Sequence, residues 1–165
     1  MHYSPQHWIE KLDLARHPEG GWFKEVYRSE EQMLPDAACF RQSGERNVCT
    51  SIYYLLEGDD FSAFHRIKSD EVWHYYTGTS AIEVLWIDKG TLRCFVLGVG
   101  EKDAFQAVVP KNTWFAARLT DRSGFALVGC TVAPGFQFDD FEMADAKLLD
   151  EFPGLAADIA SLIKC

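Results

Sequence analysis

The feature that most constrains this chain is a series of short apolar segments that follow one another from residue 48 to residue 136. Each is rich in β-branched and aromatic residues, which favour strands, and turn compositions such as EGDD, DKG and TDRSG separate them. The segments are 48–56, 61–67, 71–78, 81–87, 92–99, 105–110, 113–119 and 124–136. Short strands with a turn signal every ~10 residues are typical of an antiparallel sandwich or barrel.

Helical patterns lie at both ends of this series. Ser4-Pro5 supplies an N-cap and a proline for the first turn of an amphipathic helix, and the tail returns to a helical pattern that Pro153 divides. Residues 22–29 read as a further strand and residues 30–47 as a loop. The sequence therefore predicts one mainly β domain over residues 1–165, with short N-terminal and C-terminal helices.

The charge of the chain excludes several classes of partner. A formal net charge of −9 disfavours nucleic acid and anionic membranes, and no apolar run is long enough to cross a bilayer. The first residues lack the basic start and apolar core of a secretory signal. The five cysteines are odd in number and contain no CxxC pair, which predicts free thiols in the cytoplasm. We expect a small-molecule ligand.

The densest group of reactive side chains lies in residues 58–78. His65 falls in one predicted strand, and Glu71, Trp73 and Tyr75 share one face of the next, because side chains alternate along a strand. If both faces point into the barrel, the imidazole and the carboxyl meet at its mouth, beside two aromatic rings.

Other polar residues near the start of the chain have two interpretations. Arg28, inside the barrel, would bind a carboxylate or phosphate ligand, whereas at a solvated strand end it would have no such role. Strand alternation places Glu25 on the opposite face from Arg28. Gly20-Gly21 is interpreted as an ordinary tight turn rather than a close backbone approach, and His17 as a surface residue.

Two stretches resemble the conserved motifs of the cupin superfamily. The first motif reads histidine, one residue, histidine, three or four residues, glutamate, six residues, glycine; here His65, Ile67, Glu71 and Gly78 take those positions. The second, proline, one residue, glycine, two residues, histidine, resembles residues 110–115, with Asn112 and Phe115 replacing glycine and histidine.

The whole chain also resembles a family of small uncharacterised cupins, the fifth cupin type. The matching segments are HPEGGWFKEVYRS, FHRIKSDEVWHYYTG, PKNTWFAA and GCTVAPGFQFDDFE. The resemblance implies a double-stranded β-helix, the cupin or jelly-roll barrel, and a homodimer with sheets joined across the subunits.

A typical cupin holds a metal with three histidines and a glutamate. Ile67 and Phe115 cannot ligate a metal, so His65 and Glu71 leave two of those four ligands. His74 is a third candidate ligand, although strand alternation puts it on the opposite face from Glu71. We therefore predict no cofactor, with a divalent metal on these three residues as the alternative.

The metal-free interpretation resembles the sugar-nucleotide epimerases that share this fold. It implies His65 as general base and Glu71 as its catalytic partner, acting on a sugar or sugar-nucleotide-like metabolite. The predicted ligand-binding residues are Arg28, Tyr53, Trp73, Tyr75 and Phe115, and the candidate proton donors are Tyr53, Tyr75 and Tyr76. A non-catalytic metabolite-binding module and a metal-dependent enzyme with a rearranged site remain as alternatives.

Overall fold

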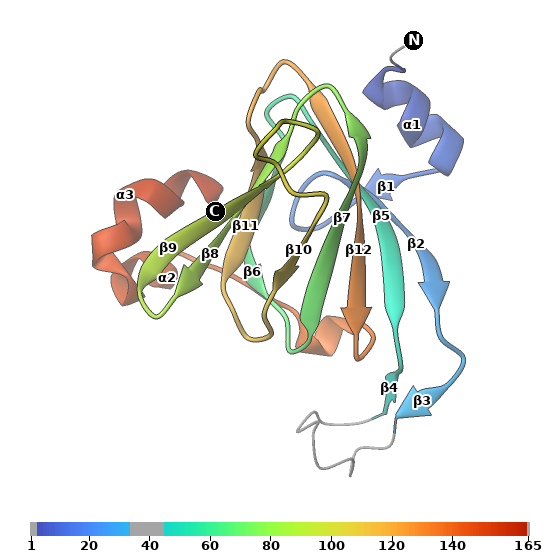
Figure 1. The fold of residues 1–165 in the computed structure, drawn as a ribbon. Coiled ribbons are helices and arrows are strands. Elements are labelled where there is room, and N and C mark those ends of the chain that lie inside the picture. The colour runs from blue at the N-terminus through green and yellow to red at the C-terminus, as the bar shows by residue number, and fades with distance from the viewer. Residues whose placement is uncertain (1–2, 34–44, 165) are drawn as a thin grey trace.

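A computed structural model describes residues 3–33 and 45–164. Two antiparallel sheets face each other and form the body of the molecule (Figure 1). The first has the order β1 (Ala15–Arg16), β2 (Trp22–Arg28), β5 (Thr50–Glu57), β12 (Phe125–Ala133), β7 (Asp70–Gly78) and β10 (Gln106–Val109). The second has the order β13 (Glu142–Met143), β6 (Phe61–Arg66), β11 (Phe115–Leu119), β8 (Ile82–Asp88) and β9 (Thr91–Leu97). The predicted mainly β fold with short terminal helices is confirmed.

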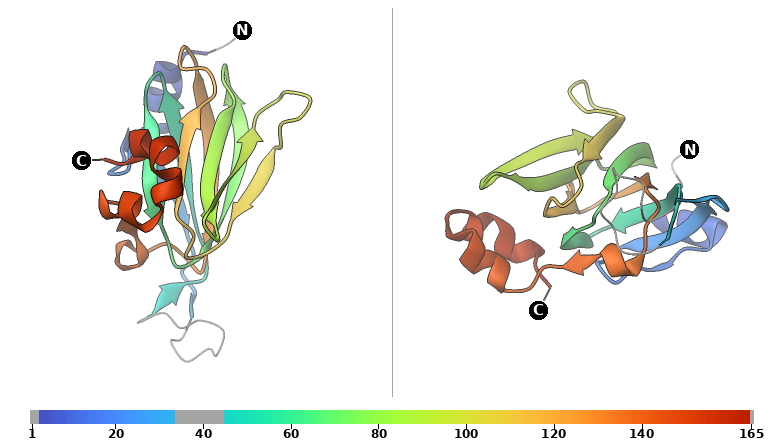
Figure 2. Two further views of the ribbon diagram at one scale, coloured as in Figure 1. Left: turned by 90° about the vertical axis from the view of Figure 1, so that its left-hand side faces the viewer. Right: turned by 90° about the horizontal axis from the view of Figure 1, so that it is seen from below.

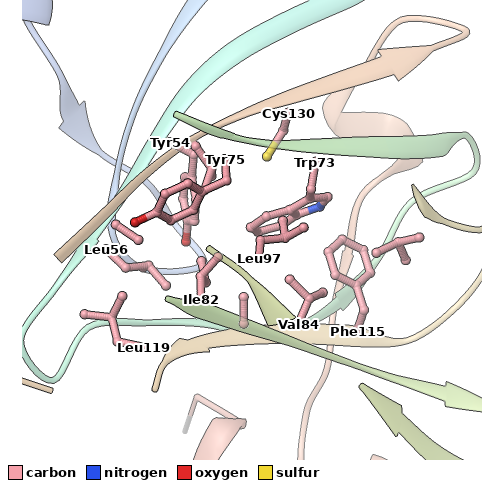
Figure 3. Packing of buried hydrophobic residues seen from close by; sticks show 14 residues of the cluster. Tyr54, Leu56, Trp73, Tyr75, Ile82, Val84, Leu97, Phe115, Leu119 and Cys130 are labelled. Carbon is pink, nitrogen blue, oxygen red and sulfur yellow. The ribbon is translucent and has the colours of Figure 1, made fainter. Parts of the chain in front are cut away.

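The space between the sheets is filled by alternate residues of facing strands. Tyr54 and Trp73 from the first sheet meet Val84 and Phe115 from the second, and all four are buried (Figure 3). Each large apolar side chain buried in this way stabilises the fold by roughly 1.5–3 kcal/mol. Because this cluster fills the space between the two sheets, most of the interior of the barrel is a packed core.

The helices cover outer faces of the two sheets (Figure 2). Helix α1 (Pro5–Leu12) begins at Ser4, whose hydroxyl accepts a hydrogen bond from the His7 amide, and it packs on the first sheet through Ile9. The tail comprises α2 (Lys147–Glu151), η2 (Pro153–Leu155), α3 (Ala156–Ile159) and η3 (Ala160–Leu162), and it packs on the second sheet. No helix in the described part of the chain has the length and apolarity that a membrane span requires.

The predicted loop over residues 30–47 is partly wrong. Strand β3 (Gln32–Met33) pairs with β4 (Arg46–Asn47), so the ends of this segment form a short ladder. Residues 34–44 lie outside the described residues. Among the predicted free thiols, Cys49, Cys94 and Cys130 are free, whereas Cys39 and Cys165 also lie outside the described residues.

A bulge in β2 changes which residues face the interior. Glu25 pairs with Ile52 and Tyr27 with Ser51, so Val26 is an extra residue without a partner in the register. The bulge reverses the alternation of β2, and Glu25 and Arg28 lie on the same face. The prediction that Glu25 faces away from Arg28 is therefore wrong.

The segment that follows β12 folds back across the open end of the barrel. It contains a cis peptide bond between Ala133 and Pro134 and a short helix, η1 (Phe138–Asp140). The Phe136 amide donates to Thr50 Oγ1, at 2.9 Å. Asp140 accepts hydrogen bonds from Arg46 Nε and Nη2 at 2.7 and 2.9 Å, in a pair that is almost fully buried. These contacts fix the segment against β5 and β4.

Candidate active site

The open end of the barrel contains a cavity of about 100 Å³. Its ionisable groups come from β2, β6, β7, β12 and the loop before β2, and Thr50 of β5 and Gln137 add further polar groups. The apolar wall consists of Phe23, Ile52, Ile67, Val132, Phe136, Phe138 and Phe141. The ionisable side chains that line it are His17, Glu19, Glu25, Arg28, His65 and Glu71, together with the thiol of Cys130. A concave apolar site with a few convergent polar groups is the usual form of a small-molecule pocket.

His65 lies at the bottom of this cavity, with 3 % of its surface exposed. Its Nδ1 is 2.7 Å from the Ala63 carbonyl, an acceptor, so Nδ1 carries a proton. Its Nε2 is 3.2 Å from Oε2 of Glu19. The ring packs against Phe115 and Phe141, with centroid separations of 4.1 and 5.3 Å. These contacts fix the orientation of the imidazole and leave Nε2 as its reactive nitrogen.

Glu19 is the partner of His65 that strand patterns did not predict. Its side chain is 9 % exposed, and Oε1 accepts a hydrogen bond from Ser62 Oγ at 2.9 Å. The Glu19 carbonyl accepts from the Ala63 amide of β6. Since Nδ1 of His65 donates to the Ala63 carbonyl, Nε2 is the nitrogen that faces Oε2 of Glu19, and the imidazole and the carboxylate form one buried basic pair.

The two glycines after Glu19 allow its loop to reach β6. Gly20 has φ of +121°, and a Cβ there would lie 2.0 Å from the Phe61 carbonyl oxygen. The Gly20 carbonyl also accepts from the Tyr54 hydroxyl at 2.8 Å. The interpretation of Gly20-Gly21 as an ordinary turn is wrong, because the main chains of the loop and β6 are in direct contact. The motif HPEGG was the sequence signal that could have identified Glu19.

His17 also lies in the cavity wall rather than on the surface, which corrects the prediction for that residue. Its side chain is 8 % exposed, and its Nδ1 accepts a hydrogen bond from the Glu19 amide at 3.2 Å. Burial lowers the pKa of His17, and this outweighs the opposite effect of the Glu19 carboxylate. His17 is therefore a neutral imidazole that positions Glu19.

Glu71 enters the cavity from β7 and is 8 % exposed. Its Oε2 and the Nε1 of Trp73 are both buried without a hydrogen-bond partner among the described residues. Burial, followed by the negative charge of Glu19, raises the pKa of Glu71 to about 8. At neutral pH this carboxyl keeps its proton and can donate a hydrogen bond to a ligand, as a neutral acid in an apolar site does.

Arg28 lines the cavity, but its guanidinium is fully occupied by protein acceptors. Nε and Nη2 bind the two Glu25 oxygens at 2.9 and 2.7 Å. Nη1 binds Asn47 Oδ1 at 2.9 Å, and Nη1 and Nη2 both bind the Phe136 carbonyl at 3.2 Å. These contacts use all five N–H groups of an arginine. Arg28 thus joins β2 to the Phe136 segment, and the prediction that it receives an anionic ligand does not fit this geometry.

The four aromatic residues predicted to contact ligand do not line the cavity. Trp73, Tyr75 and Phe115 belong to the packed core, where Tyr75 Oη donates to the Ser80 carbonyl at 3.0 Å. Tyr53 lies on the outer face of the first sheet, at 6.0 Å from the exposed Tyr76 ring. Strand alternation correctly predicted that Trp73 and Tyr75 face the interior of the barrel, but at that depth packed side chains fill the interior and leave no cavity. The tyrosines are therefore excluded as proton donors in this cavity.

The donor set does not fit the metal site that the cupin motifs imply. Ile67 and Phe115 occupy two ligand positions, and His74 pairs with Gln106 on the face opposite Glu71. Within residues 3–33 and 45–164, no group of three or more His, Cys, Asp or Glu side chains is arranged to hold a metal ion.

Comparison with known proteins identifies the family. The chain is 32% identical to an uncharacterised protein of Saccharomyces cerevisiae, YML079W, over 96% of this chain and 86% of that protein. Protein SO0799 from Shewanella oneidensis has a TM-score of 0.88 and 33% identity, with 99% of each chain covered. A hypothetical protein from Leishmania major has a TM-score of 0.88 and 27% identity, over 99% of this chain and 100% of that one.

The family Cupin_5, described as Cupin superfamily (DUF985), matches residues 6–144. This match covers both the loop that carries Glu19 and the strands that carry His65 and Glu71. The chain therefore belongs to the cupin superfamily, in the family Cupin_5.

Proposed function

We propose that the cavity is the active site of a proton-transfer enzyme, an isomerase or epimerase that acts next to a carbonyl group. The observation that carries the proposal is the presence of a basic pair and a neutral acid in one cavity. His65 Nε2 lies 3.2 Å from Glu19 Oε2, and Glu71 has an unpartnered buried oxygen. Groups whose environments favour opposite protonation states are the usual assignment of base and acid.

The proposed step moves one proton in each direction. The His65–Glu19 pair in its deprotonated form takes a proton from the carbon beside the carbonyl, and the C–H electron pair becomes the enol double bond. Glu71 donates its proton to the carbonyl oxygen. The pair then returns its proton to carbon, at the same position or, in an enediol, at the neighbouring one, while Glu71 takes back a proton from the enol oxygen; this regenerates the carbonyl and both side chains. Inversion at carbon requires water to supply the proton at the other face, and the pair then releases its own proton to water. A positioned acid or base of this kind contributes roughly 10²–10⁴-fold to a rate.

The test is deuterium exchange at carbon. Small ketones and hydroxyketones, beginning with cyclohexanone and dihydroxyacetone, are incubated with the protein in D₂O, and proton NMR follows the loss of the signal beside the carbonyl. We expect exchange with the natural sequence and a loss of about 100-fold in His65→Gln. His74→Gln is the matched control, because His74 lies on the opposite face of β7 from Glu71. Equal rates in His65→Gln and the natural sequence would refute the assignment.

A non-catalytic metabolite-binding module is the second candidate, and the apolar wall formed by Phe23, Phe136 and Phe141 favours it. It predicts saturable ligand binding without exchange in any variant. The same NMR samples separate the two functions, since binding broadens ligand signals whether or not deuterium enters carbon.

We also propose that the protein is a homodimer. Support comes from large apolar side chains exposed on the outer face of the first sheet, where Tyr27, Tyr76 and Val108 are 54%, 51% and 51% exposed. Several large apolar side chains exposed on one face of a sheet commonly contribute to an interface. Light scattering after gel filtration tests it: a mass of twice 18.7 kDa is expected, and a monomer at micromolar concentration would contradict it.

A further inference from the structure

We infer that the cavity selects compact, uncharged ligands and that Glu25 is the residue that excludes anions. The inference rests on the proposed function in taking this cavity as the ligand site, and it adds the chemical class of the ligand. Of the predicted substrates it keeps a sugar or similar uncharged metabolite, and it excludes a sugar nucleotide, which carries phosphate groups.

The first argument is the state of the cationic groups. Among the described residues that line the cavity, the positive side chain is Arg28, and the two histidines are the other basic groups. Every N–H of Arg28 already has an acceptor on Glu25, Asn47 or the Phe136 carbonyl. His17 is held neutral by its burial, and Nε2 of His65 already faces the Glu19 carboxylate at 3.2 Å. A carboxylate or phosphate ligand would find no charged donor to neutralise it.

The second argument is the excess of acidic groups. The acidic side chains that line the cavity are Glu19, Glu25 and Glu71, of which Glu71 keeps its proton. An anion would therefore face the Glu25 carboxylate on β2 and the Glu19 carboxylate on the loop before it. To reach the Arg28 guanidinium, the anion would have to displace Glu25 from a bidentate contact of 2.7 and 2.9 Å.

The third argument is the size and polarity of the space. The cavity volume is about 100 Å³, and seven apolar side chains line it together with polar side chains that are largely bonded to one another. For comparison, an apolar protein cavity of ~150 Å³ binds benzene. The space is smaller than that cavity but opens at the end of the barrel, so it suits at most one ring of about six atoms, with a carbonyl, amide or hydroxyl group directed at Glu71.

Glu25 determines this selectivity through the β2 bulge. Because Val26 is the extra residue, the Glu25 carboxylate lies on the Arg28 face and cancels its charge. Glu25→Gln keeps the length of the side chain and one acceptor oxygen, but it leaves the guanidinium charge without a counter-ion. The variant should therefore admit a carboxylate.

The experiment compares two ligands of nearly equal size and shape, one neutral and one anionic. Dissociation constants for cyclohexanecarboxamide and cyclohexanecarboxylate are measured at pH 7 by ligand-observed NMR titration. We expect the natural sequence to bind the amide at least 10-fold more tightly, and Glu25→Gln to reduce the ratio to threefold or less. Glu83→Gln is the matched control, since Glu83 forms an ion pair of equal length, 2.7 Å, with Arg118. Its ratio should equal that of the natural sequence.

Three results would overturn the inference: carboxylate bound as tightly as the amide by the natural sequence, an unchanged ratio in Glu25→Gln, or no binding of the amide. Two controls locate the amide in the cavity. Cyclohexanone should displace it, and nuclear Overhauser effects should connect its protons to the rings of Phe136 and Phe141. The readout does not need turnover, so selective binding without deuterium exchange would contradict the proposed enzyme and leave the selectivity standing. Deuterium exchange on a carboxylate substrate would support the proposed enzyme and contradict the selectivity.

Discussion

His65 Nε2 and Glu19 Oε2 lie 3.2 Å apart, and their side chains are 4 % and 9 % exposed. The two residues come from β6 and from the loop before β2, and they meet because Gly20 lets that loop contact β6. Oε1 of the same carboxylate is held by Ser62. The imidazole and the carboxylate are therefore held in hydrogen-bond geometry and form one buried pair at the cavity.

The first prediction concerns this pair. In Glu19→Gln, Nε2 loses the carboxylate that stabilises its protonated form, so deuterium exchange at carbon should fall by about 100-fold. Nitrogen-15 NMR of the ring should show Nδ1 protonated in both proteins, because its acceptor is the Ala63 carbonyl. Glu101→Gln, at an exposed loop position, is the control and should exchange at the natural rate. A ring protonated at Nε2 alone would contradict the assigned geometry.

The second prediction concerns the pH dependence of stability. Burial raises the pKa of Glu71 from 4.5 to about 8, so the folded protein binds its proton over a range where the unfolded chain has lost it. The stability that the protein gains because Glu71 binds its proton more tightly when folded is therefore fully present below pH 4.5, and it is lost as the pH rises to 8.

Glu71→Gln does not titrate, so its free energy of unfolding should exceed that of the natural sequence increasingly from pH 5 to pH 9. Between pH 5 and pH 9 the free energy of unfolding of the variant should rise, relative to that of the natural sequence, by on the order of 4 kcal/mol. Urea denaturation at pH 5, 7 and 9 measures it. A difference that stays constant across this range would show that Glu71 is ionised in the folded protein.

The third prediction concerns the close contact at Gly20. In Gly20→Ala the new methyl group meets the Phe61 carbonyl oxygen at a backbone φ of +121°, and the loop must withdraw. We expect the free energy of unfolding to fall by at least ~3 kcal/mol. Gly90→Ala is the control. Its φ is +78°, and no atom of the described residues lies within 4 Å of the added Cβ, so the loss should be the conformational cost of about 1–2 kcal/mol without a steric clash. Equal losses in the two variants would refute the contact.

The fourth prediction separates a buried ion pair from an exposed one of the same length. Arg46–Asp140 and Arg66–Glu142 both have a 2.7 Å contact, but the first pair is 8 % and 4 % exposed and the second 39% and 56%. Asp140→Asn leaves the Arg46 charge buried and should cost on the order of 3 kcal/mol. Glu142→Gln should cost less than about 1 kcal/mol. Thermal and urea denaturation of both variants provide the comparison, which fails if the two losses are alike.

Local pattern was sufficient to predict much of the fold. Strand alternation and turn composition anticipated the strands from β5 to β12, and Ser4-Pro5 marked the start of α1, because these signals depend on neighbouring residues. The pairing of β3 with β4 was missed because two-residue strands carry no periodicity.

The cavity was harder to predict, because its composition depends on where the packed core ends. Trp73 was correctly predicted to face inward, yet it lies in the filled part of the barrel, and sequence alone contains no information on depth. Glu25 was misplaced because a bulge reverses alternation without a distinct residue signature. The placement of His65 and Glu71 at the cavity agrees with the expected geometry, whereas their catalytic roles stay predictions.

The loop that carries Glu19 lies outside the strands that build the scaffold. Phe23, Ile52 and Val132, which form part of the cavity wall, belong to those strands. A single substitution at Glu19 would therefore change the polar groups of the cavity and leave these walls in place, so the chemistry of the site and its shape can be altered independently.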